Sequence, residues 1–228
     1  MIQVNNLFKK FDSLIVLQDV SFVVEPRQLI VILGPSGTGK TVLLKSIVGL
    51  IPVDRGSVII DGLDVQKANN GQIFDIRKQI GYVFQGAALF DSMSVLENIA
   101  LPIVQHTKTP SNKIRERVNE ILNIVGLPGK ENLYPRSLSG GMKRLVSIGR
   151  ALALDPKYIL YDEPTTGLDP LMRDRIVELI NYLKKNYDKM GIVVTHDLDT
   201  ARAVGDVICM LKNGRIEQLS KIGKEFYG

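Results

Sequence analysis

The sequence is short of cysteine and of aromatic residues. Tryptophan is absent from its 228 residues, aromatic residues make up 6%, and Cys209 is the one cysteine. A single cysteine excludes an intrachain disulfide, and the apolar run around Cys209 predicts a buried, unreactive thiol. No apolar run approaches the ~20 residues of a membrane-spanning helix. The N-terminus lacks a basic stretch followed by an apolar one, so we expect no signal peptide and a cytosolic chain that meets membranes through a partner.

Charge of one sign does not dominate. Lys and Arg number 29 against 24 Asp and Glu, giving a net charge of +5, and 45% of residues are hydrophobic, an ordinary globular balance. A mildly basic chain suits anionic lipid surfaces, nucleic acid or a phosphate ligand. The basic residues form only short clusters without interleaved aromatic residues, which favours a solvated surface and no nucleic-acid partner. These clusters are Lys9, Lys10, Arg115, Arg117, Lys184 and Lys185.

Hydrophobic periodicity predicts alternating strands and helices. Alternation predicts strands over 16–24 and 57–60, and short apolar runs predict buried parallel strands over 29–33, 158–161 and 192–195. Helical periodicity predicts a helix over 111–125, capped by Ser111 and ended by Gly126. It also predicts one over 170–190, begun by Asp169 and Pro170 and ended by Gly191, and one that starts near Ser139. This alternation favours an α/β core, with a mostly helical lobe over about 86–150.

A glycine-rich segment follows the strand predicted over 29–33. It reads Gly34, Pro35, Ser36, Gly37, Thr38, Gly39, Lys40 and Thr41, and it fits the P-loop pattern between a strand and a helix. Its glycines let backbone N–H groups surround a phosphate, to which the helix N-terminus adds a positive dipole. Lys40 would reach the β- and γ-phosphates, and the Thr41 hydroxyl would bind Mg²⁺. The alternative is a glycine-rich turn without a ligand.

Two acids end the strand predicted over 158–161. Burying Asp162 and Glu163 there is costly unless they meet a cation or a reacting group. Asp162 fits the carboxylate associated with Mg²⁺ in P-loop nucleotidases. Glu163 fits a general base that orients and deprotonates water. The alternative is a strand end that exposes two acids to solvent.

A third motif, the Ser-Gly-Gly sequence of residues 139–141, is weak on its own and is typical of a helix cap. Placed 23 residues before Asp162, it makes the chain resemble the ATP-binding-cassette (ABC) ATPases, the nucleotide-binding subunits of ABC transporters. The resemblance covers nearly the whole chain, with six motifs in the family's order. They are Walker A (residues 34–41), the Q-loop glutamine Gln85, the signature loop (residues 139–143), Walker B with the catalytic glutamate (Asp162 and Glu163), the D-loop (residues 166–169) and the switch histidine His196.

The resemblance implies a P-loop α/β fold with a mixed sheet core. It implies one ABC ATPase domain over 1–228, in which 1–85 and 151–228 form a RecA-like core with an N-terminal antiparallel β-subdomain. An inserted helical subdomain would span about 86–150.

It also implies catalysis between two copies paired head to tail. Each ATP would lie between one chain's P-loop and the Ser139, Gly140 and Gly141 of the other. The D-loop Asp169 would contribute to the nucleotide site, Gln85 would touch Mg²⁺ or the water, and His196 would contact the γ-phosphate. A histidine bonded to backbone is the alternative for His196 on its own.

Adenine stacking is assigned to Phe11, although Phe8 is close and a core role is open for Phe11.

A permease would dock on 86–103, through exposed Leu89, Phe90 and Met93; the alternative is that these three fill the lobe's core. His106 has no such context and is expected at the surface.

Residues 84–91 and 138–142 are similar to those of the MCE-associated ATPases of bacterial phospholipid trafficking. That similarity implies an integral permease, an MCE lipid-binding subunit and a small STAS-type subunit, with the chain on the cytoplasmic side of the inner membrane. Met142 stands where the wider family has glutamine, so that side chain's hydrogen bonds are lost. The chain ends at Gly228, without the longer C-terminal extension of some members.

Other functions stay open at this point. One is an ATPase for amino-acid, ion or lipoprotein transport. Another is a soluble ABC ATPase, which would usually carry two cassettes or a long insertion. A nucleotide-binding regulator would be expected to lack Glu163 or His196, and both are present.

Overall fold

The computed structural model describes residues 1–221. Its strands are β1 (Ile2–Phe11), β2 (Leu14–Val24), β3 (Leu29–Leu33), β4 (Arg55–Ile60), β5 (Leu63–Asp64), β6 (Ile80–Val83), β7 (Tyr158–Asp162), β8 (Met190–Thr195), β9 (Val207–Lys212) and β10 (Arg215–Lys221). Its helices are α1 (Lys40–Ile47), α2 (Asn70–Lys78), α3 (Val95–His106), α4 (Ser111–Ile124), α5 (Gly140–Ala151), α6 (Pro170–Tyr187) and α7 (Leu198–Val204), with a 3₁₀ turn over Pro135–Ser137. The predicted α/β class is confirmed.

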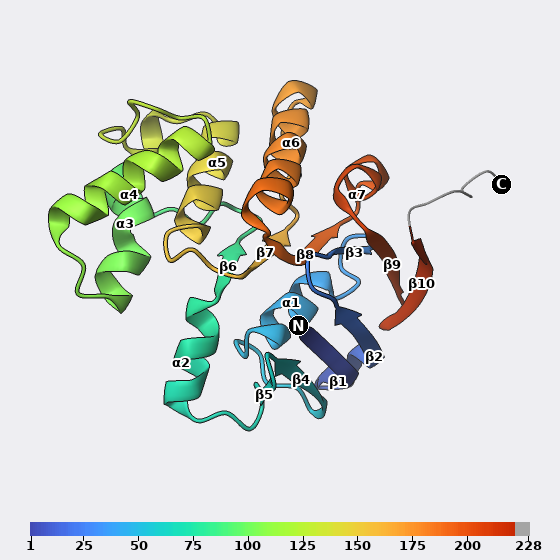
Figure 1. Cartoon of the computed structure of the whole chain (residues 1–228). Coiled ribbons are helices and arrows are strands. Elements are labelled where there is room, and N and C mark those ends of the chain that lie inside the picture. Colours follow the sequence, from blue (N-terminus) through green and yellow to red (C-terminus); the bar gives the residue numbers. More distant parts are fainter. Residues whose placement is uncertain (222–228) are drawn as a thin grey trace.

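The strands form two sheets (Figure 1). One is antiparallel, with the order β2-β1-β4-β5. The other is mixed, with the order β10-β9-β3-β8-β7-β6, in which all neighbours are parallel except β9 and β10. The parallel strands β3, β8, β7 and β6 therefore end at one edge, where α/β proteins bind their ligands.

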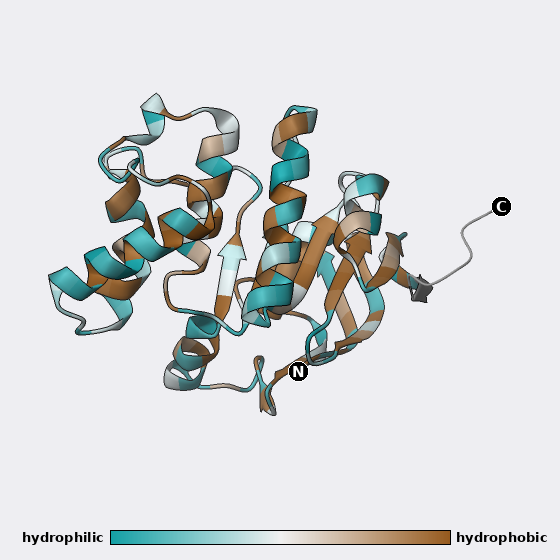
Figure 2. Ribbon diagram, turned by 45° about the horizontal axis from the view of Figure 1, so that its top comes forward, coloured by the Kyte–Doolittle hydropathy of each residue, from teal (hydrophilic) through white to brown (hydrophobic). Residues whose placement is uncertain are grey.

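Side chains of the buried strands alternate between two hydrophobic cores. In β3, Val31 packs with the helices α3 to α7, whereas Ile30 and Ile32 pack with α1 and the antiparallel sheet. Every β3 residue is buried, because both faces of the sheet are covered. Figure 2 shows these strands as predominantly hydrophobic ribbons between helices of mixed hydropathy.

The predicted helices form, with two corrections at their ends. Helix α4 starts at Ser111, but its N-cap is Pro110 and no side chain caps it, so Ser111 is not the cap. Helix α6 is capped by Asp169 as predicted, but it ends at Tyr187, short of residue 190. Asp188 takes a left-handed conformation there, and β8 starts at Met190. Apolar periodicity alone could not separate the last helical turn from the strand that follows.

Residues 86–150 hold α3, α4 and α5, which gather beside α6 (Figure 1). These helices share one hydrophobic core with the mixed sheet. The interpretation of this stretch as a subdomain stays a prediction. Of the three apolar residues expected to be exposed, Phe90 is 50% exposed, whereas Leu89 and Met93 are half-buried, and Leu89 packs against the core. The expected exposure thus holds for Phe90, whereas Leu89 follows the alternative of core packing in part and Met93 is only partly exposed.

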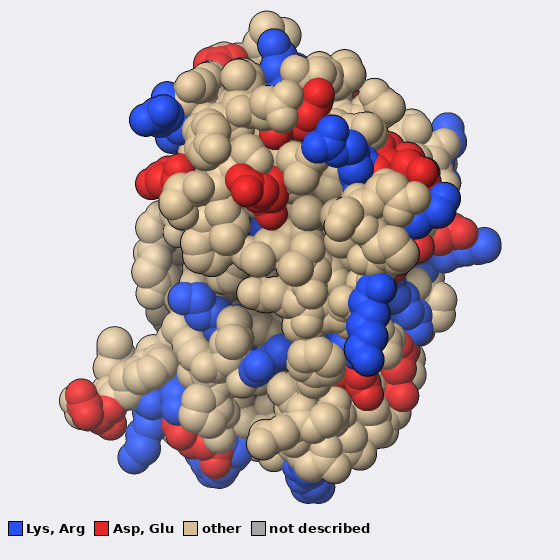
Figure 3. All heavy atoms as spheres, turned by 90° about the vertical axis from the view of Figure 1, so that its left-hand side faces the viewer, with Lys and Arg blue, Asp and Glu red and all other residues tan. Residues whose placement is uncertain are grey.

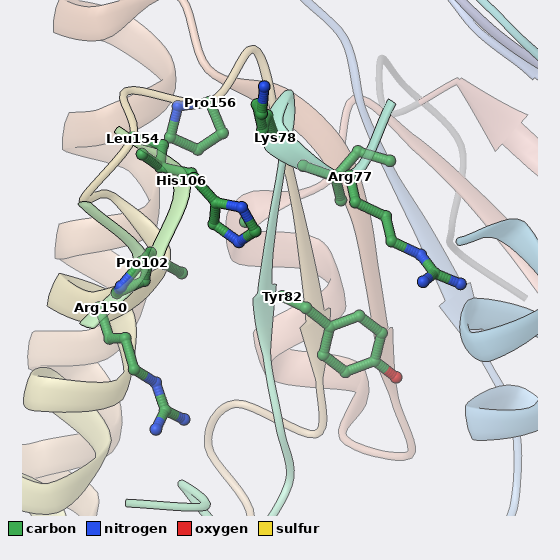
Figure 4. Close-up of a pocket in the computed structure, with 11 residues that line it drawn as sticks. Arg77, Lys78, Tyr82, Pro102, His106, Arg150, Leu154 and Pro156 are labelled. Atoms are coloured by element: carbon green, nitrogen blue, oxygen red, sulfur yellow. The ribbon is translucent and has the colours of Figure 1, made fainter. Parts of the chain in front are cut away.

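Two side chains expected at the surface are less exposed than that: Lys9 is buried and His106 is half-buried. Lys9 is 8% exposed because its ammonium group bonds Asp54 at 3.0 Å. His106 is half-buried, packs edge-on against Phe74, and lines a cavity between α2, α3 and β6 (Figure 4). Its Nδ1 is buried and has no hydrogen-bond partner in the described part of the chain.

Cys209 is buried as predicted, and burial raises the pKa of its thiol to about 11. Within residues 1–221, no helix is long and apolar enough to cross a bilayer. Lys and Arg mix with Asp and Glu over the face in Figure 3.

Candidate functional site: a P-loop beside two acids

The glycine-rich segment joins the end of β3 to the start of α1. Gly37 and Gly39 have φ values of +81° and +97°, a backbone region open mainly to glycine. A Cβ on Gly39 would also come within 2.7 Å of the Val16 side chain. Gly39 is the N-cap of α1, so the free N–H groups of the first helical turn lie beside the loop. This arrangement suits an anion such as phosphate.

Lys40 extends back along this loop. It is 5% exposed, and its ammonium group donates to the carbonyls of Gly34 at 2.7 Å and Pro35 at 2.9 Å. The same nitrogen lies 3.1 Å from Oε1 of Glu163. A buried ammonium needs such partners to remain charged.

Thr41 and Asp162 face each other across the end of the sheet. The Thr41 hydroxyl donates to Oδ1 of Asp162 at 2.9 Å, and the Tyr82 hydroxyl donates to Oδ2 at 3.2 Å. Burial raises the pKa of Asp162, although these two hydrogen bonds oppose the shift. A hydroxyl and a carboxylate are hard oxygen donors, so the pair fits Mg²⁺. Within residues 1–221, no group of three or more His, Cys, Asp or Glu could hold a metal ion, so phosphate oxygens would have to complete such a site.

Glu163 is the most heavily bonded acid of the site. Its Oε2 accepts from the Thr166 hydroxyl at 2.9 Å and lies 2.9 Å from Nδ1 of His196, while Oε1 faces Lys40. Burial acts to raise the pKa of Glu163, but the Thr166 and Lys40 hydrogen bonds and the Lys40 and His196 charges outweigh it and lower the pKa. Its backbone has a φ of +48°, and its N–H donates to Val194 of β8 at 2.9 Å. Such strained backbone is concentrated at functional sites.

One cavity collects eight of the predicted site residues. Phe11 and Gln85 line it together with Val16, Ser36, Gly37, Gly39, Lys40, Thr41, Val42 and Glu163. Phe11 is 44% exposed. Phe8 instead lies under the Arg55 guanidinium, at 4.3 Å, and lines another pocket. The geometry therefore favours Phe11 over Phe8 as the residue next to the P-loop.

The signature-loop residues are not brought to this cavity. Ser139, Gly140 and Gly141 start α5, where the Ser139 hydroxyl accepts from the Met142 N–H at 3.2 Å. Asp169 caps α6 by accepting from Met172 at 3.0 Å. The Met172 side chain packs on Gly141, so these two helix starts adjoin each other.

Sequence reasoning missed Tyr82, Thr166 and Arg144 as parts of the site. Tyr82 and Thr166 bond directly to the two acids, and Arg144 donates to the carbonyl before Gln85. Thr166 was visible only as part of the D-loop. For Tyr82 and Arg144 no local pattern gave a signal, because their partners are distant in the sequence.

Comparisons with known proteins agree with this geometry. Residues 17–166 match the family model described as ABC transporter. The chain is 43% identical over 92% of its length to a probable ribonucleotide transport ATP-binding protein of Mycobacterium tuberculosis, of which it spans 58%. It is 38% identical over 95% of its length to the intermembrane phospholipid transport system ATP-binding protein MlaF of Haemophilus influenzae, of which it spans 82%.

Solved structures show the same fold. A dimeric bacterial ABC transporter cassette superposes with a TM-score of 0.91 at 33% identity, covering 99% of this chain and 100% of that one. The post-hydrolysis dimer of an ATP-binding cassette, bound to ADP and phosphate, superposes with a TM-score of 0.89 at 33% identity, with the same coverage. The P-loop, the paired acids, the matched family model and these relatives lead to one conclusion: the chain belongs to the ABC transporter family, as an ATP-binding domain.

Proposed function

We propose that this chain hydrolyses ATP to ADP and phosphate, and that it energises phospholipid transport between bacterial membranes through a partner permease. The observation that carries the proposal is the convergence of Lys40, Thr41, Asp162, Glu163 and His196 on one end of the mixed sheet. In this arrangement a phosphate-binding loop adjoins a carboxylate suited to Mg²⁺ and a second carboxylate suited to activate water. That combination has the chemistry of phosphoryl transfer to water.

Each residue has a role that its contacts support. Lys40 and the N–H groups of residues 36–41 bind the β- and γ-phosphates. Glu163 orients water and accepts its proton, and its lowered pKa keeps it ionised near neutral pH. Thr41 and Asp162 hold Mg²⁺ with Gln85, and the metal supplies charge neutralisation on the phosphates. His196, bonded to Glu163, is placed to contact the γ-phosphate, and Phe11 to stack on adenine.

A second copy completes the site. Ser139, Gly140 and Gly141 start a helix and do not line the chain's own P-loop cavity, so their N–H groups would reach a γ-phosphate bound to another copy. Asp169 adjoins them. Dimeric solved cassettes of the same fold support this pairing.

The similarity to MlaF, an ATP-binding protein of an intermembrane phospholipid transport system, supports phospholipid as the substrate. The resemblance of residues 84–91 and 138–142 to the MCE-associated ATPases is the basis for proposing an MCE lipid-binding subunit and a STAS-type subunit as further partners, at the cytoplasmic side of the inner membrane. Similar ATP-binding proteins are also named for methionine import, at 35% identity, and for sulfate and thiosulfate import, at 40%. These relatives keep another ABC transporter as the alternative.

Glu163→Gln tests the assignment of the base. The amide cannot accept a proton, so we expect turnover to fall by about 10²–10⁴-fold, while ATP still binds and holds two copies together. Steady-state hydrolysis and size-exclusion chromatography with ATP and Mg²⁺ measure both effects. Wild-type hydrolysis by this variant would remove Glu163 from the mechanism.

The substrate is tested by purifying a tagged copy gently from its native membranes and identifying proteins and lipids by mass spectrometry. A multispanning permease with an MCE protein and bound phospholipid supports the lipid proposal. A different permease keeps the ATPase and rejects the lipid. Recovery of no membrane protein, with detergent controls, favours a soluble ABC ATPase.

A further inference from the structure

Arg144 is a buried cation that the roles above do not use. It lies on α5, five residues after Ser139, and is 6% exposed. Its Nη1 donates to the carbonyl of Phe84 at 2.6 Å. Burial lowers the pKa of the guanidinium, and the charges of Asp162 and Glu163 oppose that shift. A buried guanidinium is costly unless hydrogen bonds and opposite charges compensate it.

The Phe84 carbonyl lies at the start of the turn that carries Gln85. The same oxygen accepts from the Ala87 N–H at 3.0 Å, so Arg144 bonds the group that closes the turn. The Phe84 ring also packs on Tyr82, with centroids 4.4 Å apart, and Tyr82 bonds Asp162. One side chain of α5 is thereby linked to Gln85 and, through two aromatic residues, to Asp162.

We propose that Arg144 is a positioning residue that fixes Gln85 relative to Asp162 and couples both to the helix that starts at Ser139. This inference rests on the proposed ATPase function. The negative charges of Asp162 and Glu163 also favour the charged form of Arg144, so the helix carrying the signature loop is attracted to its own chain's site. A shift of this helix would then move the Phe84 carbonyl and with it the turn that carries Gln85.

The test compares Arg144→Gln, Arg144→Lys and a control, Arg117→Gln. Arg117 likewise donates to a backbone carbonyl, that of Leu152 at 3.1 Å, but it lies on α4 away from the acids. Hydrogen exchange of the nucleotide-free proteins reports on the Ala87 amide. We expect exchange about 10-fold faster in Arg144→Gln, because the charged hydrogen bond that anchors Phe84 is gone. Arg144→Lys keeps a charged donor and is expected to recover part of the protection, and Arg117→Gln to leave it unchanged.

Kinetics supply the second readout. We expect kcat of Arg144→Gln to fall by about 10–100-fold through misplacement of Gln85, with KM for ATP changed by less than about threefold because the P-loop is untouched. Arg144→Lys should recover part of kcat. Wild-type exchange at Ala87 in a folded Arg144→Gln overturns the proposal, whatever its kcat.

A variant that fails to fold and a wild-type protein that fails to hydrolyse ATP have different consequences for the proposal. If Arg144→Gln does not fold, Arg144→Lys decides: faster exchange than Arg117→Gln supports the proposal, and wild-type values overturn it, because a shorter donor cannot hold Phe84 in the same place. If the wild-type protein does not hydrolyse ATP, the proposed function fails, while exchange at Ala87 still decides the role of Arg144.

Discussion

At the scale of single residues, buried polar groups define both the site and the scaffold. Lys40 and Glu163 form a buried ion pair inside the site. At the far end of the mixed sheet, the partly exposed Asp61 binds the buried Tyr158. Asp61 accepts from the Lys157 ammonium and the Tyr158 hydroxyl, each at 2.7 Å, and pairs with the Met1 amino group. Contacts of this kind stabilise a fold because removing one partner leaves the other buried without compensation.

Asp61→Asn is therefore expected to destabilise the protein in a pH-dependent way. Burial acts to raise the pKa of Asp61, but the hydrogen bonds from Lys157, the N-terminus and Tyr158 lower it to about 2, below its ordinary 3.8. The stabilisation is present above pH 3.8 and is lost as the pH falls towards 2. We expect a loss of about 1 kcal/mol in the free energy of unfolding at pH 7, after allowing for partial exposure.

Urea unfolding of both proteins between pH 7 and pH 3 measures this difference. Asparagine tolerates the left-handed backbone of position 61, where φ is +47°, so the substitution probes charge rather than strain. A difference that stays constant down to pH 3 would show that the carboxylate charge is not its cause.

Cys209 gives a second prediction at this scale. Its side chain is 3% exposed and its thiol pKa is about 11, so little thiolate is available at pH 8. We expect a maleimide to leave the native protein unlabelled for hours and to label it within minutes in urea. Mass spectrometry after timed quenching distinguishes the two. Rapid native labelling would place this thiol in an opened or mobile region.

At the scale of elements, helix starts carry much of the local order. Asn69 and Ser94 form capping boxes with Gln72 and Glu97 at the starts of α2 and α3. Asn98, fully buried in α3, forms four hydrogen bonds through its side chain. Its amide nitrogen donates to the carbonyls of Phe90, Met93 and Ser94 at 3.0–3.1 Å, and its oxygen accepts from the Phe90 N–H at 2.9 Å. One side chain thus holds residues 90–94, the second half of the loop that follows Gln85.

Asn98→Ala removes all four of these bonds. We expect the free energy of unfolding to fall by about 2–3 kcal/mol, because backbone groups of residues 90–94 lose their partners. Asn123→Ala, an exposed substitution on α4, should change it by less than about 0.5 kcal/mol. Urea titrations of the three proteins measure both effects, and equal stabilities for the two variants would contradict the assigned role of Asn98.

Local patterns predicted an element well where the residues that determine it are neighbours in the sequence. The apolar runs of β3, β7 and β8 and the Asp169-Pro170 start of α6 are of this kind. The P-loop was also predictable, because its residues are contiguous. The end of α6 was wrong, since Asp188 breaks the helix before its apolar pattern stops.

Distant pairings could not be read from such patterns. The order β10-β9-β3-β8-β7-β6 depends on crossovers, and the contacts of Tyr82 with Asp162 and of Arg144 with Phe84 span 80 and 60 residues. Lys9 and His106 looked like surface residues because their partners, Asp54 and Phe74, come from other elements. The resemblance to ABC ATPases supplied roles for site residues where local physics left alternatives open.

At the scale of the whole molecule, the proposed function needs two copies of the chain to complete each nucleotide site. The start of α5 does not line the P-loop cavity of its own chain. A symmetric dimer would bring the P-loop of each copy to the signature loop of the other, and such two-fold pairs are the commonest protein assemblies. This arrangement predicts a specific behaviour for mixed variants.

Lys40→Ala and Ser139→Arg should each abolish hydrolysis alone, because both sites of either homodimer carry the defect. Mixed in equal amounts, half of the dimers would be heterodimers with one intact site, made from the Lys40 of one chain and the Ser139 of the other. We expect recovery of up to about a quarter of wild-type activity if the two sites act independently. Lys40→Ala mixed with the double variant Lys40→Ala/Ser139→Arg is the control, since no pairing there restores a site. Recovery in the first mixture alone requires Ser139 to act across the interface; equal inactivity of both mixtures, with heterodimers confirmed by differential tagging, would mean that a single intact site does not suffice or that Ser139 acts within its own chain.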